Sequence, residues 1–370
     1  MTARRRPSHR RCRLRTVSAS EGVPRERVEE LQRFALDRLP SMRLPDGMFC
    51  HEVVAPDLAP QGRSLRYTLI CLLGLQRAAR AGLETAIDTG ELLAAAMERI
   101  DSDGVTAGDL GLLLWADARA GAHSIDAIAY RLHSRIGSGM PDLEGLELSW
   151  ILIGAAEAGA GAIKQAALDH QLRRADTPSG LFAHRDEGRR ARFPNFATQI
   201  YGVLALTIAS RLGARDEALT AARRAADRLL ELQRPNGGWP WIFDIRTGRV
   251  VEPFEVYSVH QDAMAPMALL ELTKISGDPR YAEAAIRGLD WIFGENELGR
   301  PMLDRDAGVL YRSIRRRKPL DRALLYANTA LASAHLPGLA QRGGGLELNP
   351  TDRPYHLGWV LEAWAGRERL

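Results

Sequence analysis

The stretch from Leu232 to Leu272 gathers most of the residues in this sequence that could do chemistry. It starts at the end of one expected helix and ends inside the next, and it contains carboxylates, a tyrosine and a histidine. These candidates for catalysis are Asp244, Glu252, Glu255, Tyr257, His260 and Asp262. Trp239 and Trp241 offer aromatic faces that can stack on the apolar side of a sugar ring, and Gln261 adds hydrogen-bonding groups. Together these residue types favour a site for a polar, ring-shaped substrate.

Three of these residues suit different parts of a reaction. Asp262 lies near the expected N-terminus of a helix, where the helix dipole stabilises an ionised carboxylate and so favours a base or a nucleophile. His260 titrates near neutral pH and suits a base, a proton shuttle or a hydrogen-bond donor to a sugar hydroxyl. Tyr257 together with His260 suits proton abstraction beside a carboxylate, as in a lyase or an epimerase. Each of these residues also has an ordinary structural alternative, as a helix cap or a core side chain.

Hydrolysis of a glycosidic bond generally needs two carboxyl groups, one of which has a raised pKa and acts as the acid. Asp262 would supply one of them. The other would be Asp244, Glu252 or Glu255, each of which could instead be solvated or part of a turn. The sequence leaves this choice open, because the separation of the carboxyl groups depends on the fold.

A loop pattern recurs before several expected helices, in which a glycine is followed by apolar or aromatic residues. The copies read DGMFCHE (46–52), SGLFAHR (179–185), GGWPWIF (237–243) and AGVLYRS (307–313). Three copies place a histidine or an arginine after the apolar residues, and Arg185 suits a grip on a carboxylate or phosphate. The residues of these loops and of the helix starts that we expect to contact the substrate are His51, His184, Arg185, Asn195, Gln199, Tyr311 and Arg312.

The helices themselves show a repeat. A leucine followed seven residues later by a glycine closes an apolar, alanine-rich segment at six places, where a left-handed C-cap is wanted. These pairs are Leu75/Gly82, Leu114/Gly121, Leu152/Gly159, Leu206/Gly213, Leu270/Gly277 and Leu331/Gly338. Amphipathic helices alternate with them, at 24–39, 89–100, 124–136, 162–174, 216–233 and 279–293. A last helix, about 355–365, would close a ring.

This alternation predicts an all-α fold, an (α/α)6 barrel with apolar helices inside and amphipathic helices outside. The long loops before the inner helices would share one rim, with small β-hairpins near Gly180, Gly238 and Gly308, and would surround a funnel. A superhelical solenoid is the alternative, and it would require more uniform spacing of the repeats.

The loop motifs carry a resemblance to known enzymes. Asp46-Gly47-Met48-Phe49, Ser179-Gly180-Leu181-Phe182 and Gly237-Gly238-Trp239-Pro240-Trp241 are similar to the rim loops of the α/α-toroid enzymes, especially the six-hairpin glycosidase-like superfamily. The resemblance covers roughly residues 24–366. It implies the toroid fold and a carbohydrate substrate. It does not fix the reaction, because that superfamily includes glycoside hydrolases, uronate lyases and sugar epimerases.

A weaker resemblance links the chain to terpenoid cyclases, which share the toroid. Residues 233–239 (QRPNGGW) look like a degenerate form of the cyclases' Q-W repeat. The sequence has neither a DxDD nor a DDxxD motif, and the Cys-His zinc pattern of lanthionine cyclases is missing. It also lacks a glycine-rich loop with nucleotide-binding spacing and a cluster with metal-ligand spacing. We therefore expect no nucleotide cofactor and no metal.

Composition sets further bounds. Seven arginines within residues 1–15 exceed the whole net charge of +4, so the rest of the chain is mildly acidic and nucleic-acid binding is not expected. We expect residues 1–22 to be a disordered extension or the product of an upstream start codon, with a basic interaction arm as the alternative, and residues 23–370 to form a single toroid domain. Three cysteines cannot all pair within one chain and form no CxxC motif, which favours the reducing cytoplasm, and no apolar run is long enough to cross a membrane.

The sequence therefore predicts a carbohydrate-active enzyme, most simply one that hydrolyses a glycosidic bond in an oligo- or polysaccharide. A uronate lyase or sugar epimerase is the first alternative. A terpenoid cyclase-like protein and a non-catalytic glycan-binding toroid are the others. The oligomeric state is left open.

Overall fold

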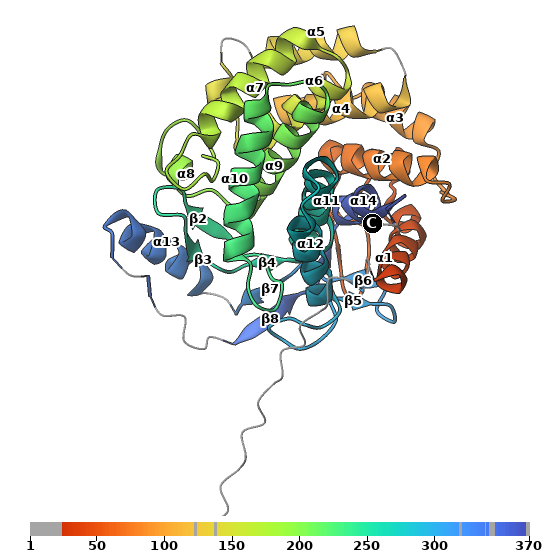
Figure 1. Ribbon diagram of the computed structural model, residues 1–370. Coiled ribbons are helices and arrows are strands. Elements are labelled where there is room, and N and C mark those ends of the chain that lie inside the picture. The colour runs from red at the N-terminus through yellow and green to blue at the C-terminus, as the bar shows by residue number, and fades with distance from the viewer. Residues whose placement is uncertain are drawn as a thin grey trace, which may run out of the picture.

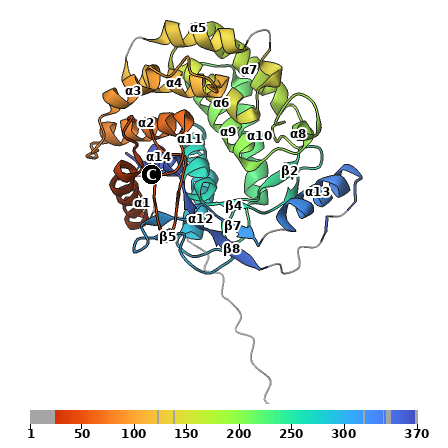
Figure 2. The same ribbon diagram turned by 180° about the vertical axis from the view of Figure 1, so that it is seen from behind.

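Helices of this chain form two concentric rings (Figures 1 and 2). The computed structural model describes residues 24–121, 124–136, 139–317, 320–336, 338–339 and 345–367. The expectation of a disordered extension at residues 1–22 falls outside these residues. Within the described part of the chain, no helix combines the length and the apolar character that crossing a bilayer requires.

The inner ring consists of the apolar helices. Each one packs on the next along the chain, and the last packs against the first, which closes the ring. Its members are α2 (Leu65–Arg80), α4 (Ala107–Ala120), α6 (Gly145–Glu157), α9 (Phe196–Arg211), the π-helical turn η3 (His260–Met264) continued by α11 (Ala265–Ser276), and α14 (Pro354–Trp364). These helices are buried on nearly every side, as their composition predicts.

The outer ring consists of the amphipathic helices, each of which covers inner helices with its apolar face. In the outer helix Asp216–Leu232, for example, Ala218, Ala222, Ala225 and Leu229 are buried at helical spacing while the opposite face is exposed. The outer helices are α1 (Arg25–Arg38), α3 (Thr89–Met97), α5 (Ile125–Ile136), α7 (Gly161–Ala175), α10 (Asp216–Leu232) and α12 (Pro279–Ile292). The predicted (α/α)6 barrel is confirmed.

The sixth inner helix is not the one that the leucine–glycine repeat indicated. The helix before Gly338 is α13 (Leu320–Ser333), which lies outside the rings against a rim strand (Figure 1). Its Tyr326 is 70% exposed, whereas residues throughout α14 are buried, so α14 occupies the inner position. Leu331 and Gly338 match the spacing of the repeat without belonging to it.

Short strands tie the rim loops together. They pair antiparallel: β1 (Val53–Val54) with β9 (Thr351–Asp352), β2 (Ile242–Asp244) with β3 (Arg249–Glu252), β5 (Leu303–Asp304) with β6 (Val309–Leu310), and β4 (Val256–Tyr257) with β7 (Ser313–Arg316) and β8 (Leu346–Asn349). Hairpins thus occur close to Gly238 and around Gly308, as predicted. Near Gly180 the described residues form no strand. The short helices η1 (Leu39–Met42), η2 (Met140–Asp142) and α8 (Arg189–Arg192) complete these loops.

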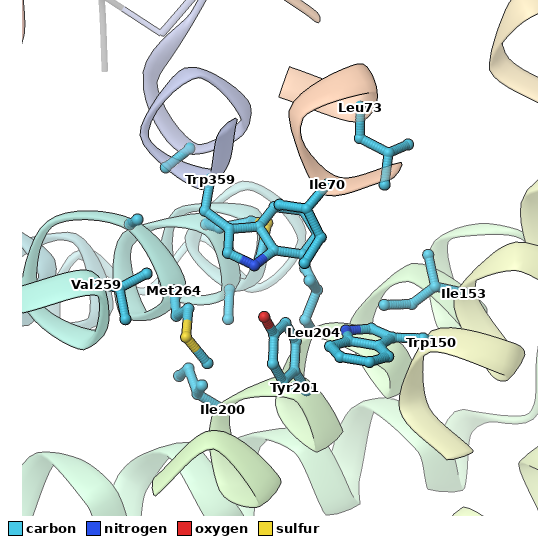
Figure 3. Close-up of a cluster of buried hydrophobic side chains, with 14 of the residues drawn as sticks. Ile70, Leu73, Trp150, Ile153, Ile200, Tyr201, Leu204, Val259, Met264 and Trp359 are labelled. Carbon is cyan, nitrogen blue, oxygen red and sulfur yellow. The ribbon is translucent and has the colours of Figure 1, made fainter. Parts of the chain in front are cut away.

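The centre of the barrel is filled rather than open. Trp150, Tyr201 and Trp359 meet there from three inner helices (Figure 3), with ring centroids 5.3 Å apart for the first pair and 6.0 Å for the second. Two glycines allow the closest helix contact: a Cβ on Gly74 would lie 2.1 Å from the carbonyl oxygen of Gly358. The funnel therefore has a solid floor, and a substrate is restricted to the ends of the barrel.

Ion pairs join the inner helices at their C-terminal ends, where they line a cavity of about 340 Å³. Arg119 donates to both carboxylate oxygens of Glu362, at 2.5 and 2.9 Å, and Arg367 donates to Glu271 at 3.0 Å. The C-caps at Gly121 and Gly277 have positive φ, 68° and 71°, as the repeat predicts. The opposite end, where the inner helices begin, carries the long loops.

Candidate active site

The first turns of the inner helices bring polar side chains together at the loop-bearing end. Contacts between successive helices establish this: Arg66 of α2 donates to Asp109 of α4 at 2.7 Å and lies 3.4 Å from Glu147 of α6. Farther round the ring, Phe196 of α9 lies 4.9 Å from His260 of η3, measured between ring centroids. Because helices of one ring run in the same direction, their N-terminal residues converge on one rim.

A cavity of about 640 Å³ opens on this rim beside α2 and α4. His51, Arg66, Tyr67 and Asp109 are among the residues that line it. Tyr67 connects the cavity to the last inner helix, because its ring lies 4.5 Å from the ring of Tyr355. The structure thus places His51, a predicted substrate contact, in a cavity wall that adjoins the start of α14.

η3 and α14 each carry a buried histidine, His260 and His356 respectively. His356 Nε2 lies 2.7 and 2.9 Å from the two carboxylate oxygens of Asp262. Asp262 is fully buried, and its burial raises its pKa, an effect that the neighbouring His356 opposes. With Nε2 turned to the carboxylate, Nδ1 of His356 is the nitrogen left for other chemistry, and it has no hydrogen-bond partner among the described residues.

His260 sits in an aromatic enclosure. Its ring stacks on Trp241, with centroids 5.6 Å apart and an interplanar angle of 17°, and it lies 5.1 Å from the ring of Tyr257. Burial lowers the pKa of His260 to about 3, and the positive charge of the neighbouring Arg312 acts in the same direction. His260 is therefore neutral at pH 7, the form in which an imidazole accepts a proton.

Tyr257 and Glu255 form a hydrogen-bonded group beside His260. The Tyr257 hydroxyl donates to Glu255 at 3.1 Å, and the same carboxylate accepts from Ser313 Oγ and, at 3.1 Å, from Asn349 Nδ2. Burial, followed by the charge of Glu255, raises the pKa of Tyr257. Tyr257 thus stays protonated and serves as a hydrogen-bond donor.

Arg312 lies over the ring of Tyr257, with its guanidinium carbon 5.2 Å from the ring centroid. Its side chain makes no hydrogen bond or ion pair with any described residue, and its Nη1 is buried. Tyr311, its neighbour, points elsewhere and donates to Asp304 at 3.3 Å.

A second polar group lies on the α6–α9 side of the rim and is centred on Glu144. Its Oε1 lies 3.7 Å from His184 Nε2, 2.9 Å from Arg185 and 2.8 Å from Arg190. His184 and the two arginines lower the pKa of Glu144 to about 2. His184 also contacts Thr198 Oγ1 at 2.6 Å, which fixes the orientation of its ring. The predicted contacts His184 and Arg185 are therefore paired with a carboxylate that the sequence analysis did not single out.

Two of the predicted catalytic carboxylates are engaged in structural pairs. Asp244 accepts two hydrogen bonds from Arg192, at 3.0 and 2.9 Å. Glu252 accepts from Arg316 at 2.7 Å, and both carboxylates are buried. We assign to these residues the anchoring of the rim loops, because buried paired charges are costly to separate.

Several predicted substrate contacts instead hold the backbone. Gln261 accepts from the Trp239 amide at 3.0 Å and donates to the Tyr257 carbonyl at 2.9 Å. Gln199 makes the same kind of pair with the backbone of Phe182, at 2.7 and 2.8 Å. Asn195 caps α9, and Trp239 is buried against Phe196. Trp241 is only partly buried and remains the aromatic face beside His260.

Sequence reasoning missed His356, Tyr355, Arg353 and Glu144. The first three begin the true sixth inner helix, which was assigned to the segment before Gly338. The register that placed Asp262 eight residues before Leu270 also finds Glu144, eight residues before Leu152, so a signal for this residue was present.

No metal site emerges from the described residues, since no group of three or more His, Cys, Asp or Glu side chains among them is placed to hold an ion. The polar groups described at the rim are imidazoles, carboxylates, phenols and guanidiniums.

Comparisons with known proteins agree with this architecture. No protein-family model and no curated protein matches the sequence. Among solved structures, a sugar epimerase from a ruminal bacterium superposes with a TM-score of 0.63 at 14% identity, covering 92% of this chain and 98% of its own. Cellobiose 2-epimerase from Bacillus thermoamylovorans B4167 gives 0.63 at 11% identity, with 92% and 99% covered. An unsaturated glucuronyl hydrolase specific for heparin gives 0.58 at 15% identity, with 92% and 96% covered.

At these identities the likeness establishes the fold alone. The chain shares the α/α-toroid fold of the six-hairpin glycosidase-like enzymes, as its loop motifs indicated.

Proposed function

We propose that this protein is a carbohydrate-active enzyme that transfers a proton at a sugar carbon next to a carbonyl or carboxyl group, as an epimerase or isomerase does. The observation that carries the proposal is the pair of histidines on adjacent inner elements. His260 is neutral and enclosed by aromatic rings, and His356 is oriented by Asp262. Two such groups on one rim are what removal and return of a proton require.

In the proposed reaction, His260 Nε2 takes the proton from the carbon, and the electron pair of the broken C–H bond moves into the adjacent C=O group. The enediolate that forms is then reprotonated by His356 Nδ1. Return to the same carbon from the opposite face inverts it. Return to the neighbouring carbon, with the hydroxyl proton of the first carbon passing to the former carbonyl oxygen, exchanges an aldose for a ketose. Asp262 contacts Nε2 of His356 and fixes the orientation of the ring, so it acts as a positioning residue. Trp241 provides the stacking face for the sugar.

Hydrolysis receives less support from the same geometry. A glycosidase generally needs two carboxyl groups on either side of the scissile bond. Asp262 is fully buried and turned to His356, while Asp244 and Glu252 are held by arginines. Glu255 is the remaining predicted carboxylate near His260, through its hydrogen bond to Tyr257. Of the four carboxylates predicted from the sequence, one thus remains as a candidate acid where two are needed.

Other features support the coarser parts of the proposal. The rim carries arginines and carboxylates, which suit a polar substrate better than the hydrocarbon of a terpenoid cyclase. The three similar structures are named as a sugar epimerase, a cellobiose 2-epimerase and an unsaturated glucuronyl hydrolase, which supports carbohydrate as the substrate class. Cys50 and Cys71 are buried free thiols, which suits the reducing cytoplasm that the cysteine content favours.

Solvent-deuterium exchange tests this function. The protein is incubated in D₂O with a panel of aldoses, ketoses and uronates, and NMR follows deuterium at each carbon. We expect deuterium at a carbon beside the carbonyl or carboxyl group, with formation of an epimer or isomer. Exchange should be lost in His260→Asn and His356→Asn and kept in His133→Asn, an exposed histidine of α5.

Hydrolysis products would contradict this proposal. Oligosaccharide cleavage with addition of water, unchanged in His260→Asn but absent in Glu255→Gln, would replace the proposal by hydrolysis.

A further inference from the structure

We propose that Arg312 binds the carboxylate of the substrate, so that the sugar is a uronate and the proton is exchanged at the carbon that bears the carboxylate. This inference rests on the proposed function, because it names the group that activates the C–H bond. It deepens the prediction of Arg312 as a substrate contact by giving it a ligand of one chemical class.

The backbone of Arg312 is fixed on both sides. Its amide donates to the Thr351 carbonyl at 2.9 Å, and its carbonyl accepts from the Ser258 amide at 2.9 Å. Ser258 lies two residues before His260, and Thr351 lies five residues before His356. Arg312 is therefore clamped between the two loops that lead into the histidine-bearing helices, and little conformational freedom is left to lose when a ligand binds.

The guanidinium of Arg312 differs from those of other arginines on the rim. Arg66 pairs with Asp109 at 2.7 Å, Arg192 with Asp244 at 2.9 Å, and Arg353 with Glu52 at 3.0 Å. Arg312 has no such partner in the part of the chain that the structure describes, although its Nη1 is buried. The side chain as a whole is partly exposed, and an anionic ligand would supply the hydrogen-bond acceptor that the buried Nη1 lacks.

The surroundings of Arg312 leave this position open to an anion. The nearest carboxylate, Glu255, is occupied by Tyr257, Ser313 and Asn349 instead of pairing with the arginine. Other groups that interact electrostatically with Arg312 are the phenols of Tyr355, Tyr257 and Tyr67 and the imidazoles of His51 and His260. Tyrosine hydroxyls can donate further hydrogen bonds to an anion without competing with it for the positive charge.

The amount of charge favours a carboxylate over a phosphate. One planar guanidinium matches one carboxylate in two parallel hydrogen bonds. A phosphate monoester carries close to two negative charges at pH 7. Arg353, which directly precedes α14 on this rim, is already paired with Glu52. A single unpaired cation thus fits a hexuronate better than a sugar phosphate.

Binding the carboxylate at Arg312 also explains the chemistry of the site. In a hexuronate the carbon that bears the carboxylate is C5, so its proton would be presented near His260, which interacts electrostatically with Arg312. Removal of that proton by His260 moves the C–H electron pair into the carboxylate, and Arg312 neutralises the charge that develops there. Return of a proton from His356 to the other face of C5 gives the C5 epimer. No oxidant, reductant or leaving group is needed.

Binding measurements test the inference independently of turnover. Isothermal titration would compare D-glucuronate, D-galacturonate and D-mannuronate with the neutral hexose of the same configuration, and with its 6-phosphate. We expect at least one uronate to bind about tenfold or more tightly than its neutral partner, and Arg312→Gln to remove that difference. Arg131→Gln, at an exposed arginine of α5, should leave it unchanged, and Arg312→Lys should retain part of it.

The outcomes separate this inference from the proposed function. Equal affinity for every uronate and its hexose, a 6-phosphate preferred to the uronate, or a uronate preference that survives in Arg312→Gln would overturn the inference. Exchange at C2 of a neutral aldose would then leave the proposed function standing. Conversely, binding that depends on Arg312 with no deuterium exchange at any carbon would keep the inference and remove the proposed function.

Discussion

His356 and Asp262 are 94 residues apart in sequence, yet Nε2 of the imidazole lies 2.7 Å from one carboxylate oxygen and 2.9 Å from the other. The two residues come from adjacent inner elements, α14 and η3, and both are buried. The backbone of Asp262 also joins η3 to α14, because its carbonyl accepts from Trp364 Nε1 at 2.5 Å. The relationship makes Asp262 a group that acts through His356.

Asp262→Asn should fold and bind sugar but lose most of its turnover. The amide oxygen can still accept from His356 Nε2, so the ring keeps its place, but the negative charge that stabilises protonated His356 is gone. We expect the rate of C–H exchange to fall about a hundredfold or more with little change in KM. Asp57→Asn, at an exposed loop position, is the control. An unchanged rate would show that His356 does not depend on Asp262.

Most of the fold could be predicted from the sequence because it depends on local patterns. A glycine at the end of each apolar helix reports a backbone with positive φ, and this held at Gly82, Gly121, Gly159, Gly213 and Gly277. The sixth pair failed because Leu331 and Gly338 satisfy the spacing by composition alone. Only burial distinguishes α13, which has an exposed side, from α14, and burial depends on which helix meets α2 when the ring closes.

The site was less predictable, because it is assembled from contacts between distant segments. The stretch 232–272 correctly drew attention to His260, Tyr257 and Trp241, which lie together. It could not reveal that Glu252 pairs with Arg316, 64 residues away, or that Asp262 contacts His356. A carboxylate whose sequence context indicates catalysis takes a structural role when a buried arginine pairs with it. That outcome is determined by the tertiary fold.

The Glu252–Arg316 pair should contribute to stability more than to chemistry. Both side chains are buried, so Glu252→Gln removes a buried countercharge that Arg316 contacts directly, and we expect the free energy of unfolding to fall by roughly 3 kcal/mol in urea denaturation. Glu347→Gln is the matched control. Glu347 on β8 pairs with Arg315, the neighbour of Arg316 on β7, but both side chains are partly exposed, so its loss should cost about 1 kcal/mol or less. Equal effects of the two changes would contradict the assignment of Glu252 as an anchor.

Asp352 should make the protein less stable as the pH rises from about 4 to 6. The carboxyl is fully buried, and burial raises its pKa to about 6. Between its ordinary pKa and this value the folded chain holds a proton that the unfolded chain has released, so stability is highest below this window and falls through it. Asp352→Asn should therefore flatten the dependence of the melting temperature on pH across this window. A slope identical to that of the unmodified protein would show that Asp352 ionises normally.

Gly358 sets the distance between α14 and α2, and a methyl group there should force these helices apart. A Cβ at this position would lie 2.8 Å from both the Cα of Cys71 and the carbonyl oxygen of Ile70, which are backbone atoms of α2 that no rotamer change can move. We expect Gly358→Ala to lower the free energy of unfolding by about 1–3 kcal/mol or more, the usual cost of overpacking.

The same change should also affect the site, because His356 lies two residues away on α14. Any displacement of α14 would lengthen the His356–Asp262 contact, so C–H exchange by the folded fraction should drop along with stability. Gly161→Ala, at the start of outer helix α7, is the matched control: its Cβ would meet nothing within 4 Å, and it should be neutral or slightly stabilising. If Gly358→Ala lost stability but kept full exchange activity, the position of α14 would not govern the geometry of the two histidines, and the dependence of His356 on helix packing would be refuted.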